Sequence, residues 1–367
     1  AFRLTDLTEA APGRAIRRYA TKGTRRLALV EGLTAAREVM TAMPRDLVRG
    51  LLAASPKQPR IEAGGRPDAG ATRIALYVHY SATGRISEMV RYQLELLAQA
   101  GFSIVFISMA EGIPDADWQA VRALVALAVQ RPNFGLDFGA WRDLLPEVRR
   151  RWSVPHELLL VNDSVLGPIH PLQPVFEAMR AGGDGLFGLT ESLQTDPHLQ
   201  SYMLLARGLA AVDDLMRFVQ QLHVSSSKWM LVRMGEVRLS RWMRRRGHRV
   251  AALFGYDRLV RATLANPTER KRLQATYRRL WNLEQLSPEA AIAALHRRPL
   301  NPTHHLWRVL ATQFNCPFLK TELIRRNPAR LPGVTDWQSL VPADSPCPIP
   351  VIEAHLATLD PINAFCG

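Results

Sequence analysis

Short apolar runs that alternate with stretches of helical periodicity constrain the fold of this chain more than any other feature. The runs lie at residues 74–78, 104–107, 126–130 and 158–161. Between the first two, apolar side chains recur at helical spacing, at Ile86, Met89, Val90, Leu94 and Leu97. Strands that alternate with helices predict an α/β fold built on a mostly parallel sheet flanked by helices.

The loops that follow these strands are the expected place for chemistry. In a parallel α/β sheet, ligands bind in the crevice at the carboxyl ends of the strands. Tyr80 follows the first apolar run, residues 131–137 follow the third, and residues 162–167 follow the fourth. We therefore expect these three loops to converge on one site.

The domain organisation is predicted from length and composition. A chain of 367 residues exceeds what one hydrophobic core usually holds, so we expect a main domain with attached elements. Residues 1–55 are predicted as a basic helical N-terminal segment and residues 56–72, rich in Pro, Gly and Ala, as a linker. The catalytic domain is predicted at 73–335, with helical additions toward its end. Residues 336–367 are predicted as a C-terminal tail, which the sequence leaves either ordered or loose.

Composition and charge narrow the class of protein. No apolar run approaches the roughly 18 residues that a membrane-spanning helix needs. The three cysteines have neither the spacing nor the even number of a disulfide framework, and no signal segment is evident, so we expect the reducing cytoplasm. The net charge of +14 favours polyanions: nucleic acid, an anionic membrane surface or phosphate-bearing substrates. Because no nucleic-acid-binding motif is present, we expect no nucleic acid partner.

The motif NFGLDFGAWR at 133–142 follows a strand and opens a helix. Its glycines permit a ligand to approach the backbone closely, so Asn133, Gly135 and Asp137 are candidates for contact with a phosphate or a sugar. The alternative is that the motif is an ordinary turn.

Asp163 is the strongest single candidate, because a buried apolar strand runs directly into Asn162, Asp163 and Ser164. A carboxylate at the rim of a parallel sheet is placed to face a diphosphate and its divalent metal, Mg²⁺ or Mn²⁺. The alternatives are an aspartate that caps a helix or a turn, and a metal-free site in which arginines neutralise the phosphates.

Glu236 begins a helix with apolar residues at i, i+3 and i+4 spacing. A carboxylate there either stabilises the helix dipole or acts as a general base on an acceptor hydroxyl. The same helix and its exit carry an arginine cluster, which either holds a diphosphate or forms a solvated face: Arg238, Arg241, Arg244, Arg245, Arg246 and Arg249.

Together these segments resemble the rhamnan synthesis protein F family of bacterial glycosyltransferase-like proteins. Four ordered blocks between residues 73 and 330 carry the resemblance. They are NFGLDFGAWR at 133–142, LVNDSVLGP at 160–168, FGLTES at 187–192 with HLQSY at 198–202, and NP at 301–302 through PFLKTEL at 317–323 to NP at 327–328. The order is also similar to that of transferases with the GT-A fold, so the resemblance implies a GT-A-like sheet.

The resemblance implies roles for individual residues. Glu236 matches the catalytic base, and Asp163 matches the acid that faces the metal or the diphosphate, although Asn162 stands where a second acid is usual. The implied donor-binding residues are Tyr80, Asn133, Gly135, Asp137, Asn162, Asp163 and Ser164. The implied acceptor- or sugar-binding residues are Glu191, His198, Gln200, Ser201 and Lys320. Hydrogen-bonding side chains suit a polyhydroxylated ligand.

The sequence therefore predicts a glycosyltransferase, a hexosyltransferase and more narrowly a rhamnosyltransferase. It would take a sugar from a nucleotide-sugar donor, dTDP-rhamnose or a GDP-sugar, and add it to a lipid-linked or polysaccharide acceptor of a bacterial surface polysaccharide or O-antigen. The basic segments predict peripheral attachment to the anionic cytoplasmic face of the inner membrane. The alternative is a catalytically inactive glycan-binding or scaffolding module of a polysaccharide assembly complex.

Overall fold

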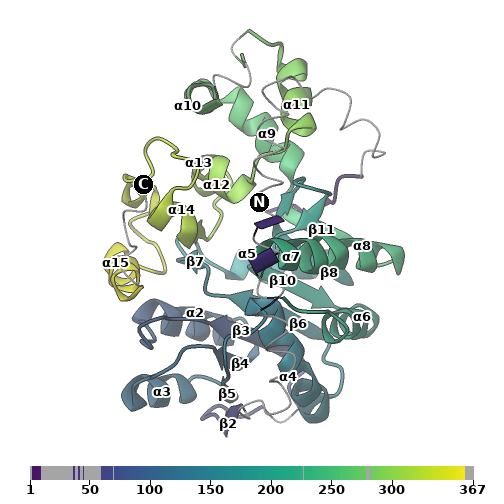
Figure 1. Cartoon of the computed structure of the whole chain (residues 1–367), viewed down its shortest axis with the longest axis vertical. Helices are drawn as coiled ribbons and strands as arrows, with labels where there is room; N and C mark the ends of the chain where they lie inside the picture. Colours follow the sequence, from purple (N-terminus) through teal and green to yellow (C-terminus); the bar gives the residue numbers. More distant parts are fainter. Residues whose placement is uncertain are drawn as a thin grey trace.

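The computed structural model describes residues 2–9, 59–68, 70–225, 227–277, 282–283 and 285–359, together with positions 36, 37, 40, 41 and 44. A central sheet runs through this part of the chain with helices on both faces (Figure 1). The molecule is therefore a mixed α/β protein, as the alternation of apolar runs predicts.

The main sheet has the strand order β1-β11-β8-β10-β6-β3-β4-β5-β2, and β9 pairs with β8 outside this path. In chain order its strands are β1 (Thr5–Asp6), β2 (Arg60–Ala63), β3 (Arg73–His79), β4 (Ser103–Ser108), β5 (Leu127–Gln130), β6 (Glu157–Asn162), β8 (Gly185–Ser192), β9 (His198–Leu199), β10 (Met203–Arg207) and β11 (Val250–Phe254). A small second sheet pairs β7 (Val165–Leu166) with β12 (Leu319–Lys320).

Most of the main sheet is parallel. β3 pairs in parallel with both β4 and β6, β4 pairs in parallel with β5, and β8 pairs in parallel with β11. β10 is antiparallel to both β6 and β8, so these two strands run in the same direction on either side of it. The prediction of a mostly parallel sheet flanked by helices is confirmed.

The helices follow the strands as expected for a wound sheet. They are α2 (Glu88–Gln99), α3 (Asp115–Arg122), α4 (Leu136–Trp152), α5 (Gln173–Ala181), α6 (Leu209–Gln220), α7 (Lys228–Leu231), η1 (Val232–Val237), α8 (Arg238–Arg245), α9 (Tyr256–Ala265), α10 (Pro267–Tyr277), α11 (Pro288–Arg297), α12 (Pro302–His305), α13 (Trp307–Thr312), α14 (Thr321–Arg326), η2 (Trp337–Leu340) and α15 (Ile349–Thr358). None of the helices in the described ranges has the length and apolar character needed to cross a bilayer.

The sheet separates two hydrophobic cores. On β3, Ala75 and Tyr77 face the core that contains α2, α3 and α5, whereas Leu76 and Val78 face the core that contains α4 and α6. Alternate residues of a strand point to opposite faces, and both faces here are covered. This double burial explains why the strand reads as a continuous apolar run rather than as an alternating pattern.

Gly135 sets the start of α4, the helix that carries part of the predicted site. Its backbone is left-handed, with φ of 75°, and a Cβ at this position would lie 2.7 Å from the Cβ of Val224. Only glycine avoids both the backbone strain and this contact. Gly135 therefore fixes the direction in which α4 leaves the sheet.

The N-terminal segments differ from the sequence-based prediction where the structure describes them. Thr5–Asp6 form the edge strand β1 against β11, so the predicted helix does not hold for residues 2–9. The positions described between 36 and 44 are helical, and the rest of segment 1–55 lies outside the described residues. Within the predicted linker, Arg60–Ala63 form strand β2 on β5. Edge strands this short leave little periodicity in a sequence to detect.

The described residues after 335 pack against the main domain. A third core cluster joins Met89 of α2 to Trp337 and Ile352, so η2 and α15 pack onto the main domain. Thr83 Oγ1 also donates a 2.8 Å hydrogen bond to the carbonyl of Thr358. The predicted boundary at 335/336 therefore falls inside a continuous hydrophobic cluster.

Glu157 at the start of β6 is the most heavily ion-paired carboxylate in the sheet. Its side chain is 1% exposed, and its oxygens lie 3.0 Å from Arg180 Nη2 and 3.0 Å from Arg207 Nε. Burial raises the pKa of this carboxyl, but the hydrogen bonds and charges of Arg180 and Arg207 outweigh it and leave the pKa lowered. The cluster ties α5 to two strands of the sheet.

We expect Glu157→Gln to lower the free energy of unfolding by about 3–5 kcal/mol at pH 7, because the three arginines that pair with it, Arg73, Arg180 and Arg207, would lose their buried charged partner. The ion-pair contribution is present above the unfolded pKa of about 4.3 and is lost as pH falls through the lower folded pKa, so the gap should narrow in acid. Urea denaturation at pH 7 and pH 3.5 measures it. Glu147→Gln, which removes an ion pair with the well-exposed Arg150, is the matched control and should change stability little. Equal losses in the two variants would contradict the argument.

Candidate functional site

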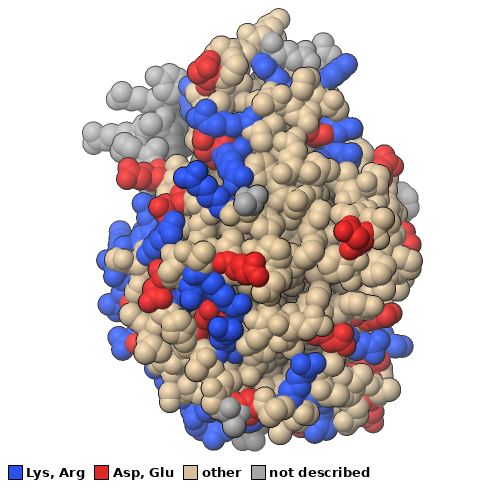
Figure 2. Space-filling model, turned by 180° about the vertical axis from the view of Figure 1, so that it is seen from behind, with Lys and Arg blue, Asp and Glu red and all other residues tan. Residues whose placement is uncertain are grey.

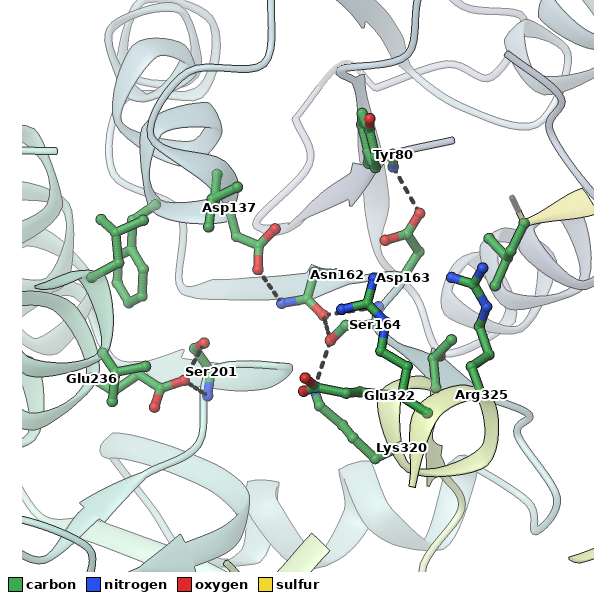
Figure 3. Close-up of a pocket in the computed structure, with 17 residues that line it drawn as sticks. Tyr80, Asp137, Asn162, Asp163, Ser164, Ser201, Glu236, Lys320, Glu322 and Arg325 are labelled. Carbon is green, nitrogen blue, oxygen red and sulfur yellow. Dashed lines mark hydrogen bonds between the residues drawn. The ribbon is translucent and has the colours of Figure 1, made fainter. Parts of the chain in front are cut away.

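A cavity of about 510 Å³ opens at the carboxyl ends of β3 and β6. One wall is made by the loops after these strands and the start of α4, a second by η1, and a third by α14. Figure 3 shows Tyr80, Asp163 and Asp137 around one end, Glu236 with Ser201 on another side, and Lys320, Glu322 and Arg325 on the side of α14. The lining residues are Tyr80, Leu136, Asp137, Phe138, Asn162, Asp163, Ser164, Ser201, Leu231, Val232, Glu236, Lys320, Thr321, Glu322, Arg325, Arg326 and Leu359.

The loop after β6 is held by its own polar side chains. Asn162 Nδ2 donates a 2.6 Å hydrogen bond to Asp137 Oδ2, and Asn162 Oδ1 accepts from both the backbone N–H and the hydroxyl of Ser164. Asp163 Oδ2 accepts a 2.7 Å hydrogen bond from the backbone N–H of Tyr80. These contacts link the ends of β3, β6 and α4 into one rigid rim.

Asp163 is held toward its neutral form. The pKa of Asp163 is raised to about 8, mainly because of burial and in part because of the nearby charge of Asp137, while the Tyr80 N–H and Lys320 act in the opposite direction. Perturbed carboxyls in a cavity are typical of functional sites. At neutral pH this carboxyl therefore holds a proton.

Basic side chains reach the cavity from the C-terminal part of the domain. Lys320 Nζ donates a 2.7 Å hydrogen bond to Ser164 Oγ and lies 5.0 Å from the centre of the Tyr202 ring. Arg325 and Arg326, in the last turn of α14, line the same wall. This wall brings three cations within reach of a bound anion.

Glu236 lies on a six-residue π-helical segment, η1, between α7 and α8. Such segments are rare and occur frequently at functional sites. Glu236 Oε1 accepts from the backbone N–H of Ser201 at 2.9 Å and from its hydroxyl at 2.5 Å. Burial raises the pKa of Glu236, but His198 and Ser201 outweigh this effect and the pKa is lowered. Glu236 is therefore a carboxylate at neutral pH.

The structure brings most of the predicted site residues together. Eight of them line the cavity: Tyr80, Asp137, Asn162, Asp163, Ser164, Ser201, Glu236 and Lys320. His198 does not line it, but its Nε2 lies 3.5 Å from Glu236 Oε2 behind the cavity wall.

The remaining predicted residues lie outside the cavity lining. Glu191 is buried and accepts from the backbone N–H groups of Thr8 and Tyr256, so it anchors β1 and the start of α9. Gln200 is a hydrogen-bond partner of Thr190 and Asn301. Gly135 acts through its backbone conformation, and Asn133 lies in the loop before it. For Glu191 in particular, a structural role replaces the predicted contact with a sugar.

The cavity also contains residues that the sequence did not single out. They are the apolar Leu136, Phe138, Leu231, Val232 and Leu359, and the polar Thr321, Glu322, Arg325 and Arg326. Thr321 and Glu322 lie inside the PFLKTEL block, so the motif pointed to the right segment, but the two arginines lie just beyond its end.

The arginine cluster of α8 does not line the cavity. Arg241 forms an ion pair with Asp196, Arg246 Nε lies 3.2 Å from Asp214, and Arg249 Nε lies 2.7 Å from Asp6. The sequence left two interpretations of this cluster open, a diphosphate-binding site and a solvated face. These positions fit the solvated face.

Within the described part of the chain, no group of three or more His, Cys, Asp or Glu side chains is arranged to hold a metal ion. Asp163 and Asp137 nevertheless lie close enough to interact electrostatically. Mg²⁺ commonly takes one or two protein carboxylates and completes its shell with water and substrate phosphates. In their ionised forms, Asp163 and Asp137 would supply the one or two carboxylates that such a cation takes.

Comparison with known proteins agrees with the resemblance inferred from the motifs. A model of the family described as rhamnan synthesis protein F matches residues 104–268, which span β4 to the first turn of α10 and include both Asp163 and Glu236. A relative from Sinorhizobium fredii, the uncharacterized protein y4gN, is 24% identical over 195 residues. That match covers 52% of this chain and 50% of the relative, so the chain spans about half the length of the curated relative.

We expect Asp163→Asn to stabilise the protein, by about 1–2 kcal/mol at pH 8. Asparagine keeps an acceptor for the Tyr80 N–H without the cost of a buried charge. Because the folded pKa of Asp163 is raised to about 8, the wild-type protein loses stability as pH rises from about 4 to about 8, and the variant does not. Partial exposure of Asp163 screens some of this effect.

Urea denaturation at pH 5 and pH 8 tests this expectation. Asp344→Asn, at an exposed position, is the control and should show the same difference at both values of pH. A gap for Asp163→Asn that stays constant between pH 5 and pH 8 would show that the carboxyl is not held neutral.

Proposed function

We propose that this protein is a glycosyltransferase that moves a sugar from a nucleotide-sugar donor to a growing bacterial surface polysaccharide. The observation that carries the proposal is the placement of two unlike carboxyls in one cavity, at the carboxyl ends of parallel strands. Asp163, kept neutral, lies with the cations of α14, and Glu236, kept ionised, lies on the π-helical segment. Sugar transfer needs cations near the diphosphate of the donor and an ionised base near the acceptor hydroxyl.

The reaction is a direct displacement at the anomeric carbon of the donor. The acceptor hydroxyl transfers its proton to Glu236 as its oxygen forms the new bond to that carbon. The bond between the anomeric carbon and the diphosphate breaks, and the leaving nucleoside diphosphate keeps the electron pair. Direct displacement by a single base inverts the configuration at the anomeric carbon.

Lys320, Arg325 and Arg326 are assigned to the diphosphate, because cations that face the leaving oxygens stabilise the charge that develops there. If a divalent ion accompanies the donor, Asp163 and Asp137 would hold it, and it would neutralise the same charge. Tyr80, Asn162 and Ser164 shape the rim of this donor half of the cavity.

Two lines of support connect the proposal to sugar transfer. The description of the matched family names rhamnan synthesis, which favours a rhamnosyl donor such as dTDP-rhamnose, with a GDP-sugar as the alternative. The mostly parallel sheet with the antiparallel β10 between β6 and β8 supports a GT-A-like arrangement. The acceptor would be a lipid-linked or polysaccharide chain.

A catalytically inactive glycan-binding module is the second candidate. One observation favours it: Asn162 occupies the position where a second acid is usual, and its side chain is engaged by Asp137 and Ser164. This candidate predicts binding of sugars without turnover of any nucleotide-sugar.

The first experiment is thermal unfolding with a panel of nucleoside diphosphates and their sugars, with and without Mg²⁺ or Mn²⁺. Ligand at about a hundredfold its dissociation constant stabilises by about 2.7 kcal/mol, a shift of several degrees. We expect one nucleoside diphosphate to stabilise the wild-type protein, and Lys320→Met to weaken this response. Arg245→Gln, on the outer face of α8, is the matched control and should respond like the wild type.

Turnover of the donor identified in this way then separates the two candidates. We expect Glu236→Gln to lower kcat by about 10²- to 10⁴-fold while donor-induced stabilisation persists, because only the base is lost. Unchanged turnover in Glu236→Gln would remove Glu236 as the base. Absence of a response to every nucleotide would favour the inactive glycan-binding module.

We also propose that the exposed arginines of α8 help to hold the protein on an anionic membrane surface, where a lipid-linked acceptor is presented. Figure 2 shows Lys and Arg side chains gathered along one side of the molecule, with acidic side chains between them. Arg238, Arg244 and Arg245 are exposed on α8. This helix directly follows η1, the segment that carries Glu236. Basic residues near an anionic surface contribute about 1 kcal/mol each.

Liposome flotation at low salt tests the membrane contact. We expect binding to vesicles with anionic lipid but not to neutral vesicles, with a loss of binding at high salt because the Debye length shortens. The double variant Arg244→Gln/Arg245→Gln should bind less, whereas Arg261→Gln, on α9, should bind as the wild type does. Equal binding to neutral and anionic vesicles would contradict an electrostatic contact.

A further inference from the structure

His198 is a buried residue that the proposed reaction does not yet use. It lies on β9, its side chain is 3% exposed, and it is separated from the cavity by Glu236 and Ser201. Its ring contacts two acceptors: the backbone carbonyl of Asp196, at 2.7 Å from Nδ1, and Glu236 Oε2, at 3.5 Å from Nε2. In this position the ring of His198 contacts the protein and does not line the cavity.

The two contacts together determine the protonation of the ring. A carbonyl oxygen only accepts hydrogen bonds, so Nδ1 must carry a hydrogen. If the ring is neutral, Nε2 then presents a lone pair to the carboxylate of Glu236, which is repulsive. The arrangement is attractive only when one further proton lies between Nε2 and Oε2. Because Glu236 is ionised, the geometry is attractive when His198 carries a hydrogen on each ring nitrogen.

The surroundings of the pair do not offer another charged partner in the described contacts. Asp196 directs its carboxylate to Arg241 of α8, and Glu191 on β8 accepts from backbone N–H groups. Ser240 of α8 is uncharged, and its hydroxyl oxygen accepts a hydrogen bond from the backbone N–H of Leu199. The charge of His198 is therefore directed at Glu236.

The contacts of Glu236 also fix which oxygen is available for chemistry. An ionised carboxylate has about four acceptor positions on its two oxygens. Ser201 fills both positions on Oε1 with its N–H and hydroxyl. His198 fills one position on Oε2, which leaves the second for a group that enters the cavity.

We propose that His198 is a positioning residue that keeps Glu236 ionised and presents one lone pair of Oε2 to the acceptor hydroxyl. This inference rests on the proposed transferase function. In the reaction, the acceptor oxygen gives its proton to Oε2, so Glu236 becomes neutral while the imidazolium keeps both of its hydrogens. After the product leaves, Oε2 returns the proton to water and the pair recovers its starting charge.

The direct test is nitrogen NMR of the histidine side chains at pH 7, which reads protonation without any substrate. We expect His198, one of ten histidines in the chain, to show two protonated ring nitrogens in the wild type. In Glu236→Gln it should change to the neutral form with the hydrogen on Nδ1. His198→Gln assigns its signals by their absence.

The chain offers an internal control for this measurement. His248 Nε2 lies 2.8 Å from Asp214 Oδ2, in a second histidine–carboxylate pair remote from the cavity lining. Glu236→Gln should leave the His248 signals unchanged, and Asp214→Asn should alter His248 but not His198. A neutral His198 in the wild type, at a pH where Glu236 is ionised, would overturn the inference.

The dependence of kcat/KM on pH is a second readout, which would not change if His198 had only a structural role. Loss of the imidazolium in His198→Gln removes the main cause that lowers the pKa of Glu236, so this pKa rises. The acid limb of kcat/KM against pH should therefore shift to higher pH, and kcat at pH 6 should fall about tenfold or more with little change in KM for the donor. An unshifted acid limb would overturn the role of His198.

The two readouts separate this inference from the proposed function. One outcome is a doubly protonated His198 that responds to Glu236→Gln in a protein that turns over no nucleotide-sugar. It would support the pairing of His198 with Glu236 and overturn the transferase function. Turnover that requires Glu236 but is unaffected in pH profile by His198→Gln would support the transferase and overturn the positioning role.

Discussion

The parallel pairing of β3 with β6 places beside each other the two loops that carry Tyr80 and Asp163. Val78 lies opposite Asn162 in the register, so the chain leaves both strands at the same edge of the sheet. One residue later, the backbone N–H of Asp163 donates to the carbonyl of Val78, and the Tyr80 N–H donates to the Asp163 side chain. A shift of this register by one residue would turn Asp163 away and break both bonds.

The part of the cavity at the ends of β3 and β6 follows local rules that a sequence can show. Apolar runs mark the strands, and the residues after them meet at one edge of a parallel sheet, so the sequence predicts that Tyr80, Asp137 and Asp163 lie together, as they do in the cavity lining. Arg325 and Arg326 were missed because they reach the cavity through β12 pairing with β7, a two-residue antiparallel contact between distant segments. Short long-range pairings leave no periodicity in the sequence.

The residues beside Glu236 show a different limit of prediction from sequence. Glu191 and His198 are polar residues in strands beside the site, and composition alone does not distinguish a side chain that faces a ligand from one that faces the protein. Both are buried, and their partners are backbone groups and Glu236 rather than the cavity. Buried polar side chains must find such partners, so a hydrogen-bonding residue next to a site is as compatible with support as with contact. The short edge strands β1 and β2 are also difficult to predict from the sequence, because their pairing depends on strands far away in the chain.

The two carboxyls of the cavity have opposite protonation for a physical reason that the fold supplies. Asp163 accepts one backbone N–H and lies near the negative charge of Asp137, so its neutral form is favoured. Glu236 accepts two hydrogen bonds from Ser201 and lies 3.5 Å from the ring of His198, so its ionised form is favoured. Titratable pairs whose environments push their pKa values apart are the usual signature of separate acid–base roles. In the proposed reaction, a neutral Asp163 would remove one negative charge from a cavity that is also lined by Lys320, Glu322, Arg325 and Arg326. The proposed binding of a diphosphate and the ionisation of the proposed base would therefore depend on the same separation of environments.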